Sequence, residues 1–289
     1  MATIADWVEG ARIRTLPAAA APVLVGTGAA YALDAGSVPR ALLAAGVALA
    51  LQIGVNFAND YSDGVRGTDD HRTGPPRLTG SGAARPRTVK LAAFASFGVA
   101  AALGLALCAL AGTWWLLGVG VLCVLAAWGY TGGRNPYGYR GLGEVGVFVF
   151  FGLVATLGTT YTQALQVSWP AVAGAVGIGF IACALLMANN LRDIPTDRAS
   201  GKRTLAVRLG DRRSRWTYVA LTVVPFVLAG AVAPAHPWAL LTLALVPLVV
   251  REARTVLGGA TGRDLIVVLR DTGLLELGYG ILLGLGLLL

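Results

Sequence analysis

The sequence predicts an all-α polytopic membrane protein, a bundle of about nine transmembrane helices around a central cavity. Three observations favour this class. Only 13% of the 289 residues are charged and 56% are hydrophobic, whereas about 25% of a soluble domain is charged. Several apolar runs reach the roughly 20 residues that cross a bilayer core. Lys and Arg also fall between alternate runs, as in proteins that cross a membrane several times. We expect one transmembrane domain over residues 1–289.

Nine apolar runs, taken in chain order, are the expected spans, and each ends where polar residues, Gly or Pro interrupt it. They cover residues 16–33, 41–58, 91–111, 114–131, 145–165, 171–189, 216–232, 238–250 and 272–289. The chain has 39 glycines, and in a bilayer small residues let helix backbones approach closely. We expect such packing around Gly118–Gly120 and at the Gly280-x-x-x-Gly284 spacing.

The basic residues predict how the spans are oriented. If the N-terminus is cytoplasmic, all 23 Lys and Arg residues except Arg40 fall in cytoplasmic segments, which is a strong positive-inside pattern. We therefore expect a multi-pass protein of the cell inner (plasma) membrane, with its N-terminus and long polar loops in the cytoplasm. A net charge of +8 in a soluble protein would suggest nucleic acid. Here the partner is the lipid bilayer, and we expect no nucleic-acid partner.

Two polar clusters interrupt the apolar pattern at the ends of spans. The first, after the second span, is Asn56, Asn59, Asp60 and Asp63, and the second, after the sixth span, is Asn189, Asp193 and Asp197. Spacings of three and four residues place the members of each cluster on one helix face. Four spans separate the clusters, so both lie on the same side of the membrane. Polar groups at such helix ends usually face the bundle interior or a wet cavity.

The chemistry of these clusters indicates a metal ion and a diphosphate. Carboxylates that converge on one cavity repel each other unless a cation lies between them. Carboxylate and amide oxygens suit Mg²⁺, which takes its other ligands from water and substrate phosphate. Basic residues that can neutralise a diphosphate follow each cluster closely. They are Arg66, Arg77, Arg198 and Lys202.

Two other interpretations of the acidic residues compete with a metal site. Either cluster alone is compatible with a solvated loop in which Asp and Asn cap helix ends. An ion pathway is a further alternative, because transporters also carry carboxylates in their spans. Acids at mid-depth of the spans are nearly absent, because Glu144 opens the fifth span and Glu276 lies early in the ninth. This disfavours an ion pathway. We interpret Glu252, Asp264 and Asp271 as surface pairs of the last basic loop.

The two clusters also resemble known motifs. Asn59-Asp60-x-x-Asp63 and Asp193-x-x-x-Asp197 resemble the aspartate motifs, NDxxDxxxD and DxxxD, of the UbiA superfamily of intramembrane prenyltransferases. Gly67 stands at the usual position of a third acid in the first motif, and Asp69 follows two residues later.

This departure is similar to one branch of the superfamily. The stretch NDYSDGVRGTDDHRTGPPRLTGSG resembles the branch that prenylates dihydroxynaphthoate in menaquinone synthesis. Further matching pieces lie at 12–17, 130–136 and 139–144. The resemblance therefore covers most of the chain up to about Gly210, and beyond that point it rests on hydropathy alone.

The resemblance implies a UbiA-like helical fold and a reaction. A polyprenyl group would pass from polyprenyl diphosphate to 1,4-dihydroxy-2-naphthoate with loss of carbon dioxide, giving demethylmenaquinone, with Mg²⁺ as the cofactor. The implied metal ligands are Asn59, Asp63, Asp69, Asp193 and Asp197, and the implied catalytic residues are Asp60, Asp63, Asp193 and Asp197. The implied diphosphate-binding residues are Asn56, Asn59, Arg66, Arg77, Asn189, Arg198 and Lys202. Arg14 and Tyr130 are expected to contact the acceptor.

Two alternatives stay open at this point. One is another aromatic prenyltransferase of the same superfamily, with hydroxybenzoate or homogentisate as the acceptor. The other is an ion-coupled transporter, which would carry flux that depends on Asp63.

Overall fold

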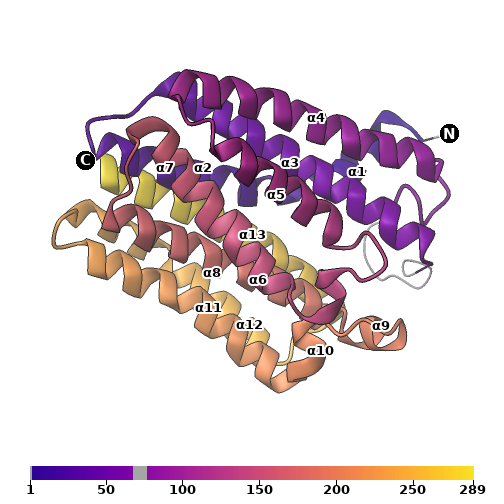
Figure 1. The fold of residues 1–289 in the computed structure, drawn as a ribbon. Coiled ribbons are helices and arrows are strands. Elements are labelled where there is room, and N and C mark those ends of the chain that lie inside the picture. Colours follow the sequence, from indigo (N-terminus) through magenta and orange to yellow (C-terminus); the bar gives the residue numbers. More distant parts are fainter. Residues whose placement is uncertain (1, 68–76) are drawn as a thin grey trace.

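Each expected span corresponds to a helical stretch in the computed structural model, which describes residues 2–67 and 77–289. In chain order these are α2 (Pro17–Tyr31), α3 (Val38–Val65), α4 (Pro86–Ala111), α5 (Leu116–Gly129), the continuous α6 (Gly143–Val147), η3 (Phe148–Val154) and α7 (Ala155–Ala164), then α8 (Trp169–Arg192), α11 (Asp211–Val232), η4 (Pro237–Leu245) with α12 (Val246–Leu257), and α13 (Gly262–Leu288) (Figure 1). Shorter helices connect them: α1 (Ile4–Ala11), η1 (Ile13–Thr15), η2 (Tyr137–Arg140), α9 (Ile194–Ala199) and α10 (Leu205–Leu209).

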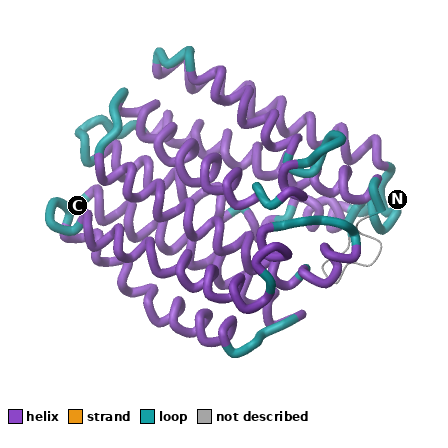
Figure 2. Tube along the Cα trace, turned by 60° about the horizontal axis from the view of Figure 1, so that its bottom comes forward, coloured by secondary structure: helices purple, strands orange, loops and turns teal. Residues whose placement is uncertain are grey.

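Five of the described stretches are long and apolar enough to cross a membrane. They are α3, α4, the continuous stretch Gly143–Ala164, α8 and α11. α5 is a shorter apolar helix of 14 residues. Figure 2 shows that the helices run the length of the molecule and that the loops gather at its two ends. The all-helical class expected from composition is confirmed.

Several helices continue past the apolar runs that predicted them. α3 ends at Val65, so the first polar cluster lies in its last three turns rather than in a loop. The expected basic loop after the eighth span is mostly helical, because α12 reaches Leu257 and α13 begins at Gly262. Hydropathy reports where a helix leaves the lipid, whereas the backbone hydrogen bonds of a helix continue for as long as the local sequence permits.

Sequence neighbours pack side by side, and the chain closes on itself. α3 packs along α4, α8 packs along α11, and α2 near the N-terminus packs along α13 near the C-terminus (Figure 1). Most of the apolar stretch of α8 is buried, whereas less than half of each of the other four long apolar stretches is buried. α8 therefore lies inside the bundle, and it carries the second polar cluster at its end.

Glycines make the α2–α13 contact possible. A Cβ atom at Gly28 would lie 2.2 Å from the backbone oxygen of Gly284, and one at Gly280 would lie 2.7 Å from the Cα atom of Ala21. The close packing predicted at Gly280 and Gly284 is therefore confirmed. The same prediction is wrong for Gly118 and Gly120, where a Cβ would meet nothing within 4 Å, because α5 buries none of its residues.

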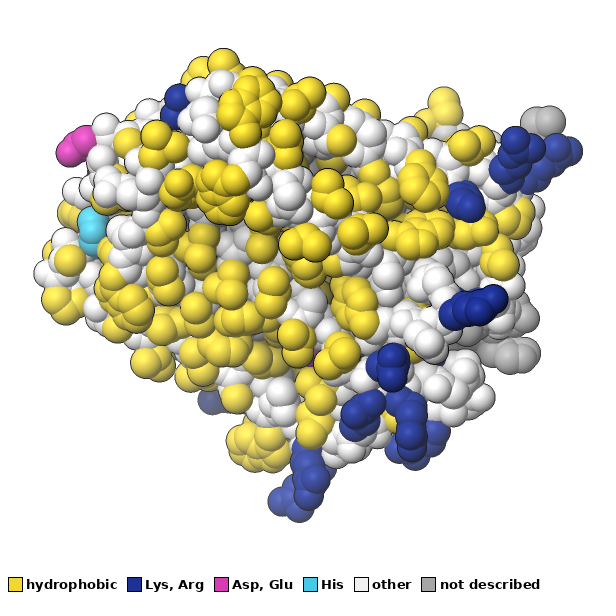
Figure 3. Space-filling model, in the orientation of Figure 1, with side chains coloured by type: hydrophobic (Ala, Val, Ile, Leu, Met, Phe, Trp, Pro, Cys, Tyr) yellow, Lys and Arg dark blue, Asp and Glu magenta, His cyan; other side chains and the backbone are white. Residues whose placement is uncertain are grey.

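The surface is apolar along the bundle and basic at one end. Figure 3 shows hydrophobic side chains over most of the visible face and Lys and Arg gathered toward one end of it. Large exposed apolar residues include Leu122 and Leu125 of α5 and Val227 of α11. A soluble monomer rarely exposes so continuous an apolar face. The described surface is that of a multi-pass membrane protein, and the side that faces the cytoplasm stays a prediction.

Candidate active site

A cavity of about 780 Å³ opens where α3 and α8 end. Residues of the first polar cluster that line it are Asn56, Asn59 and Asp63, and those of the second are Asn189, Asp193 and Asp197. The two clusters are 126 or more residues apart in sequence, from Asp63 to Asn189. The even number of spans between them predicts that both lie on the same side of the membrane, and the structure brings both to one cavity.

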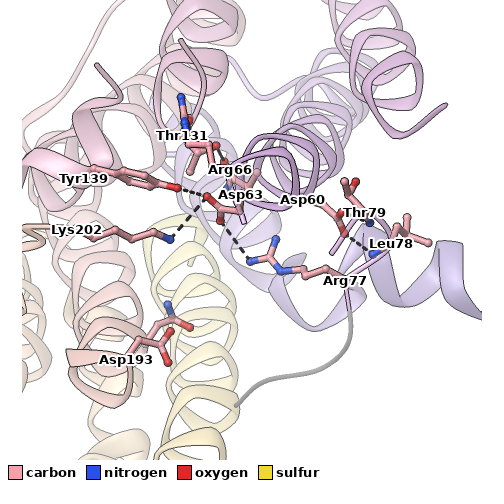
Figure 4. A network of polar contacts seen from close by, with 12 residues as sticks. Asp60, Asp63, Arg66, Arg77, Leu78, Thr79, Thr131, Tyr139, Asp193 and Lys202 are labelled. Carbon is pink, nitrogen blue, oxygen red and sulfur yellow. Dashed lines mark hydrogen bonds and ion pairs between the residues drawn. The ribbon is translucent and has the colours of Figure 1, made fainter. Parts of the chain in front are cut away.

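Asp63 is the centre of a network that joins the two clusters (Figure 4). It is buried at 5% exposure. The Nζ atom of Lys202 lies 3.7 Å from its Oδ1, and the Nη2 atom of Arg77 lies 3.9 Å from its Oδ2. The hydroxyl of Tyr139 donates a hydrogen bond to its Oδ1. Lys202 follows the second motif, so this ion pair connects the end of α3 with the loop after α9.

Tyr139 holds the cations of this network as well as the acid. The Lys202 ammonium lies 4.5 Å from the centre of its ring and the Arg66 guanidinium lies 5.5 Å from it, both within range of a cation–π interaction. The backbone oxygen of Tyr139 accepts a hydrogen bond from the backbone N–H of Arg203 at 2.8 Å. Tyr139 therefore joins η2 to the loop that carries Lys202.

Asp60 differs from Asp63, although both belong to the first motif. It is fully buried, and its two oxygens accept hydrogen bonds from the backbone N–H groups of Leu78 and Thr79, each at 2.8 Å. It points away from the cavity side of the network (Figure 4) and does not line the cavity. At about 100° per helical residue, Asp60 falls at one edge of the face that its cluster shares. Its contacts hold the segment next to Arg77.

The amides of the first cluster are bound by the protein. The Nδ2 atom of Asn56 donates to the Ala11 oxygen at 2.9 Å and to Thr15 Oγ1 at 3.0 Å, which ties the N-terminal segment to α3. The Oδ1 atom of Asn59 accepts a hydrogen bond from Thr131 Oγ1 at 2.7 Å. Both amides border the cavity, but the side-chain nitrogen of Asn56 is engaged by its hydrogen bonds to the N-terminal segment.

The second cluster lies at a break between two helices. Pro195 sits in the first turn of α9, and because proline lacks an N–H group it prevents α8 from continuing. Asp193 lies in this break, where both of its oxygens accept hydrogen bonds from the Arg192 guanidinium at 2.7 Å. The same guanidinium donates to Asn189 Oδ1 at 2.9 Å. The break turns these groups toward the cavity.

Asp197 is held less tightly than Asp193. It is buried, and its Oδ2 accepts one long hydrogen bond, 3.4 Å from Thr204 Oγ1. Burial raises the pKa of Asp197 to about 6, and the Lys202 charge opposes part of that rise. A further cation in the cavity would stabilise its carboxylate form.

The other predicted site residues lie at different distances from this centre. Arg66 is exposed, and its guanidinium donates to the backbone oxygens of Thr131 and Gly133 rather than lining the cavity. Arg198 lines a neighbouring surface pocket of about 650 Å³, which it shares with Lys202. Arg14 is exposed and Tyr130 is partly buried, and both line the cavity. Asp69 lies outside the described residues.

The donor set was compared with the needs of Mg²⁺. Within the described part of the chain, no three acidic, His or Cys side chains are close enough to hold a metal by themselves. Single carboxylates and amide oxygens nevertheless line the cavity beside buried cations. Mg²⁺ commonly takes only one or two carboxylates and completes its shell with water and substrate phosphates. The donors therefore fit a metal that arrives together with a diphosphate.

Some site residues were missed from the sequence. Tyr139, Thr131, Arg192 and Asn190 contact the clusters or line the cavity, but none was assigned a role. Tyr139 begins one of the matched pieces, 139–144, and Arg192 precedes the second motif directly. Those positions were the available signals, but the partner of each side chain depends on the folding of distant loops.

Comparison with known proteins agrees with the motifs. Residues 19–263 match the model of the UbiA prenyltransferase family. The 1,4-dihydroxy-2-naphthoate octaprenyltransferase of Mycobacterium tuberculosis is 57% identical over 95% of this chain and 94% of that protein. The protein of the same name from Escherichia coli is 39% identical over 87% of this chain and 84% of its own. These matches extend the resemblance past Gly210, where sequence motifs alone had ended.

Solved structures share the fold at low sequence identity. The apo structure of a UbiA homolog from Aeropyrum pernix has a TM-score of 0.72 at 18% identity, covering 95% of this chain and 97% of that one. A UbiA homolog from Archaeoglobus fulgidus, bound to GPP and Mg²⁺, has a TM-score of 0.68 at 14% identity, covering 98% and 99%. With its family match, its close relatives and this shared fold, the chain belongs to the UbiA prenyltransferase family.

Proposed function

We propose that this chain transfers a polyprenyl group from polyprenyl diphosphate to 1,4-dihydroxy-2-naphthoate, with loss of carbon dioxide, in menaquinone biosynthesis. The names of its 57% and 55% identical relatives support this acceptor. The observation that carries the chemistry is the buried ion-pair network of Asp63 with Lys202 and Arg77, at the edge of a largely apolar cavity. Such a cavity can take a charged head group and an apolar tail together.

The polar end of the cavity binds the leaving group. An allylic diphosphate ionises when the charge of its leaving group is stabilised. Lys202 and Arg77 are already buried there, so they are desolvated before the substrate arrives and interact strongly with phosphate oxygens. Asp60 holds the chain next to Arg77 through its two backbone hydrogen bonds. Asp60 would therefore position Arg77 for the phosphate without touching the phosphate itself.

Mg²⁺ fits this end of the cavity. Asn59, Asp63, Asp193 and Asp197 would hold it, together with Asp69. When bound, it would supply Lewis-acid stabilisation of the diphosphate. The chain's own contribution is to place carboxylates on two helices of one bundle, so that donors from both clusters face the same phosphate groups.

The remaining walls suit the tail and the acceptor. Apolar residues of α3 and η3, among them Leu51, Val55, Phe150 and Phe151, line the cavity and would enclose the polyprenyl chain. Arg14 and Tyr130 also line it, and we assign them to the acceptor carboxylate and ring. The basic end of the molecule would face the cytoplasm, in keeping with the positive-inside pattern.

Product formation by the purified chain tests this function. We expect prenylated product only with Mg²⁺, a labelled polyprenyl diphosphate and the dihydroxynaphthoate, and loss of product for Asp193→Ala. Asp264→Ala removes an exposed acid and is the matched control, expected to be as active as the wild type. Activity with hydroxybenzoate instead of the naphthoate would overturn the acceptor assignment, and ion flux in liposomes without product would favour a transporter.

A further inference from the structure

A buried acid outside both motifs has an incomplete set of partners. Glu144 lies in the first turn of α6 and is 8% exposed. Its Oε1 accepts a hydrogen bond from Asn190 Nδ2 at 3.0 Å. Its Oε2 is buried and, within the described residues, has no hydrogen-bond partner. Asp63 and Asp193 are matched by cations, whereas Glu144 is held by an amide.

An unpaired buried carboxyl oxygen is unfavourable, and beside a cavity a bound ligand can supply the hydrogen bond that it lacks. Removing such an oxygen from water without a new hydrogen bond raises the free energy of the folded state. The nearest described surroundings face the cavity, since Asn190, Gly146 and Tyr130 all line it. The preceding residue, Gly143, lies so close to Tyr130 that a Cβ there would be 3.4 Å from the phenol oxygen. Glu144 therefore lies directly behind the wall that these residues form.

This wall lies beside the diphosphate end of the cavity. Tyr130 is within electrostatic range of Glu144 and also of Asp63 and Asp197. It stacks edge-on against Tyr137, with ring centres 5.5 Å apart, and both rings line the cavity. A flat aromatic molecule could lie against these rings and present a hydroxyl group at its edge to Glu144.

We propose that Glu144 accepts the proton of a ring hydroxyl of the aromatic acceptor and that Asn190 positions its carboxylate. The inference rests on the proposed prenyl transfer. Asn190 donates to Oε1 and so favours the charged form of the acid, which leaves Oε2 to receive the proton. The acceptor hydroxyl would in turn provide the hydrogen bond that this oxygen lacks.

The chemistry needs such a base. The allylic carbon–oxygen bond of the donor breaks and diphosphate leaves. Attack of the resulting allylic cation on the ring carbon that carries the carboxylate forms a new carbon–carbon bond. The neighbouring hydroxyl becomes a carbonyl, and its proton passes to Glu144. The bond to the carboxylate then breaks and releases carbon dioxide, and its electron pair restores the aromatic ring. The proton returns from Glu144 to the oxygen, so atoms and charges balance. General bases of this kind typically accelerate a reaction about 10²–10⁴-fold.

The test separates donor binding from prenyl transfer. For Glu144→Gln we expect kcat to fall about 100-fold or more, with Mg²⁺-dependent binding of a non-hydrolysable polyprenyl thiodiphosphate unchanged. The matched control is Glu276→Gln, a fully buried acid on α13 without a described hydrogen-bond partner, and no described residue within five positions of it lines the cavity. It should transfer prenyl groups like the wild type.

A second readout distinguishes a base from a structural residue. A ring-fluorinated dihydroxynaphthoate has a more acidic hydroxyl, so the deficit of Glu144→Gln should shrink with it, whereas a packing defect would not respond. If the Gln variant does not fold, Glu144→Asp is tested in its place. We expect this variant to have a lower kcat and unchanged binding of the thiodiphosphate. Transfer by a folded Gln variant within about threefold of the wild type, or an equal deficit with both acceptors, would overturn the inference. If the wild type did not bind the thiodiphosphate at all, the proposed function itself would be wrong.

Discussion

Two groups of buried acids lie near one end of the bundle, and they are bound in different ways. Of the acids that line the cavity, Asp193 is bonded tightly by Arg192, whereas Asp63 has a looser arrangement. Its cations, Lys202 and Arg77, are themselves mostly buried and lie 3.7 and 3.9 Å from its oxygens. The brace acids, Glu252 of α12 and Asp271 of α13, are buried at 3% and 2% exposure. Their cations, Arg251 and Arg270, are mostly exposed.

The contacts of the brace acids are complete. Arg251 donates to Glu252 at 2.7 Å and also to Asp271, and Arg270 donates to Asp271 at 2.7 Å. These hydrogen bonds join α12 to α13. The described ion pairs of Asp63 with Lys202 and Arg77 are longer than hydrogen bonds, and a cavity lies beside them. Buried charges in tight contact stabilise a helix pair, whereas buried charges spaced around a cavity can rearrange around a phosphate.

The largest expected effect is at Asp63. Asp63→Asn keeps the shape of the side chain but removes a charge that we assign to the metal and diphosphate. We expect turnover to fall by about 10³-fold, at the upper end of effects for a single stabilising group, in a protein that still elutes as a folded monodisperse species. Steady-state prenyl transfer in detergent or nanodiscs measures this. Turnover near the wild-type rate would remove Asp63 from the site.

Lys202 should have the next largest effect. Lys202→Gln removes the buried cation that joins the second motif to Asp63, and we expect kcat/KM for the prenyl donor to fall by about 10- to 100-fold. Arg203→Gln is the matched control, because its exposed side chain can be changed while its backbone N–H still bonds Tyr139. An equal loss in both variants would indicate a general effect of loop charge on donor attraction, against the specific role of Lys202.

The features of this structure that could be predicted from the sequence are those set by patterns that repeat along the chain. Apolar runs predicted the nine helical stretches, and the even number of spans predicted that the two motifs meet. The separation of Asp60 from Asp63 could not be predicted, because it depends on the turn around Leu78 folding back against α3. The interpretation of Glu252 and Asp271 as surface pairs was wrong, because the expected loop is helical and α12 packs against α13 there. Asp264 is exposed, as expected.

Asp60 tests the difference between positioning and contact. Asp60→Asn leaves one carbonyl oxygen where two oxygens accept backbone N–H groups. One buried N–H group then loses its partner, so we expect a loss of stability of about 1–3 kcal/mol and a fall in turnover of about tenfold through displacement of Arg77. Mg²⁺ dependence should stay as in the wild type. A change in the Mg²⁺ concentration for half-maximal rate would instead place Asp60 among the metal ligands.

The smallest effect on turnover is expected at the brace. Asp271→Asn weakens two hydrogen bonds to arginines, yet those arginines are mostly exposed, so water solvates the charge that is released and limits the loss. We expect the unfolding midpoint to fall by a few degrees, while turnover per folded molecule and donor KM stay unchanged. Thermal unfolding and prenyl transfer should be measured on the same preparation, with Asp63→Asn beside it. The two variants should then show opposite patterns, one unstable but active and the other stable but inactive. Arg270, which bonds Asp271, also lines the cavity. If Asp271→Asn lowered turnover as strongly as Asp63→Asn, tight contact would therefore not distinguish a structural acid from a functional one.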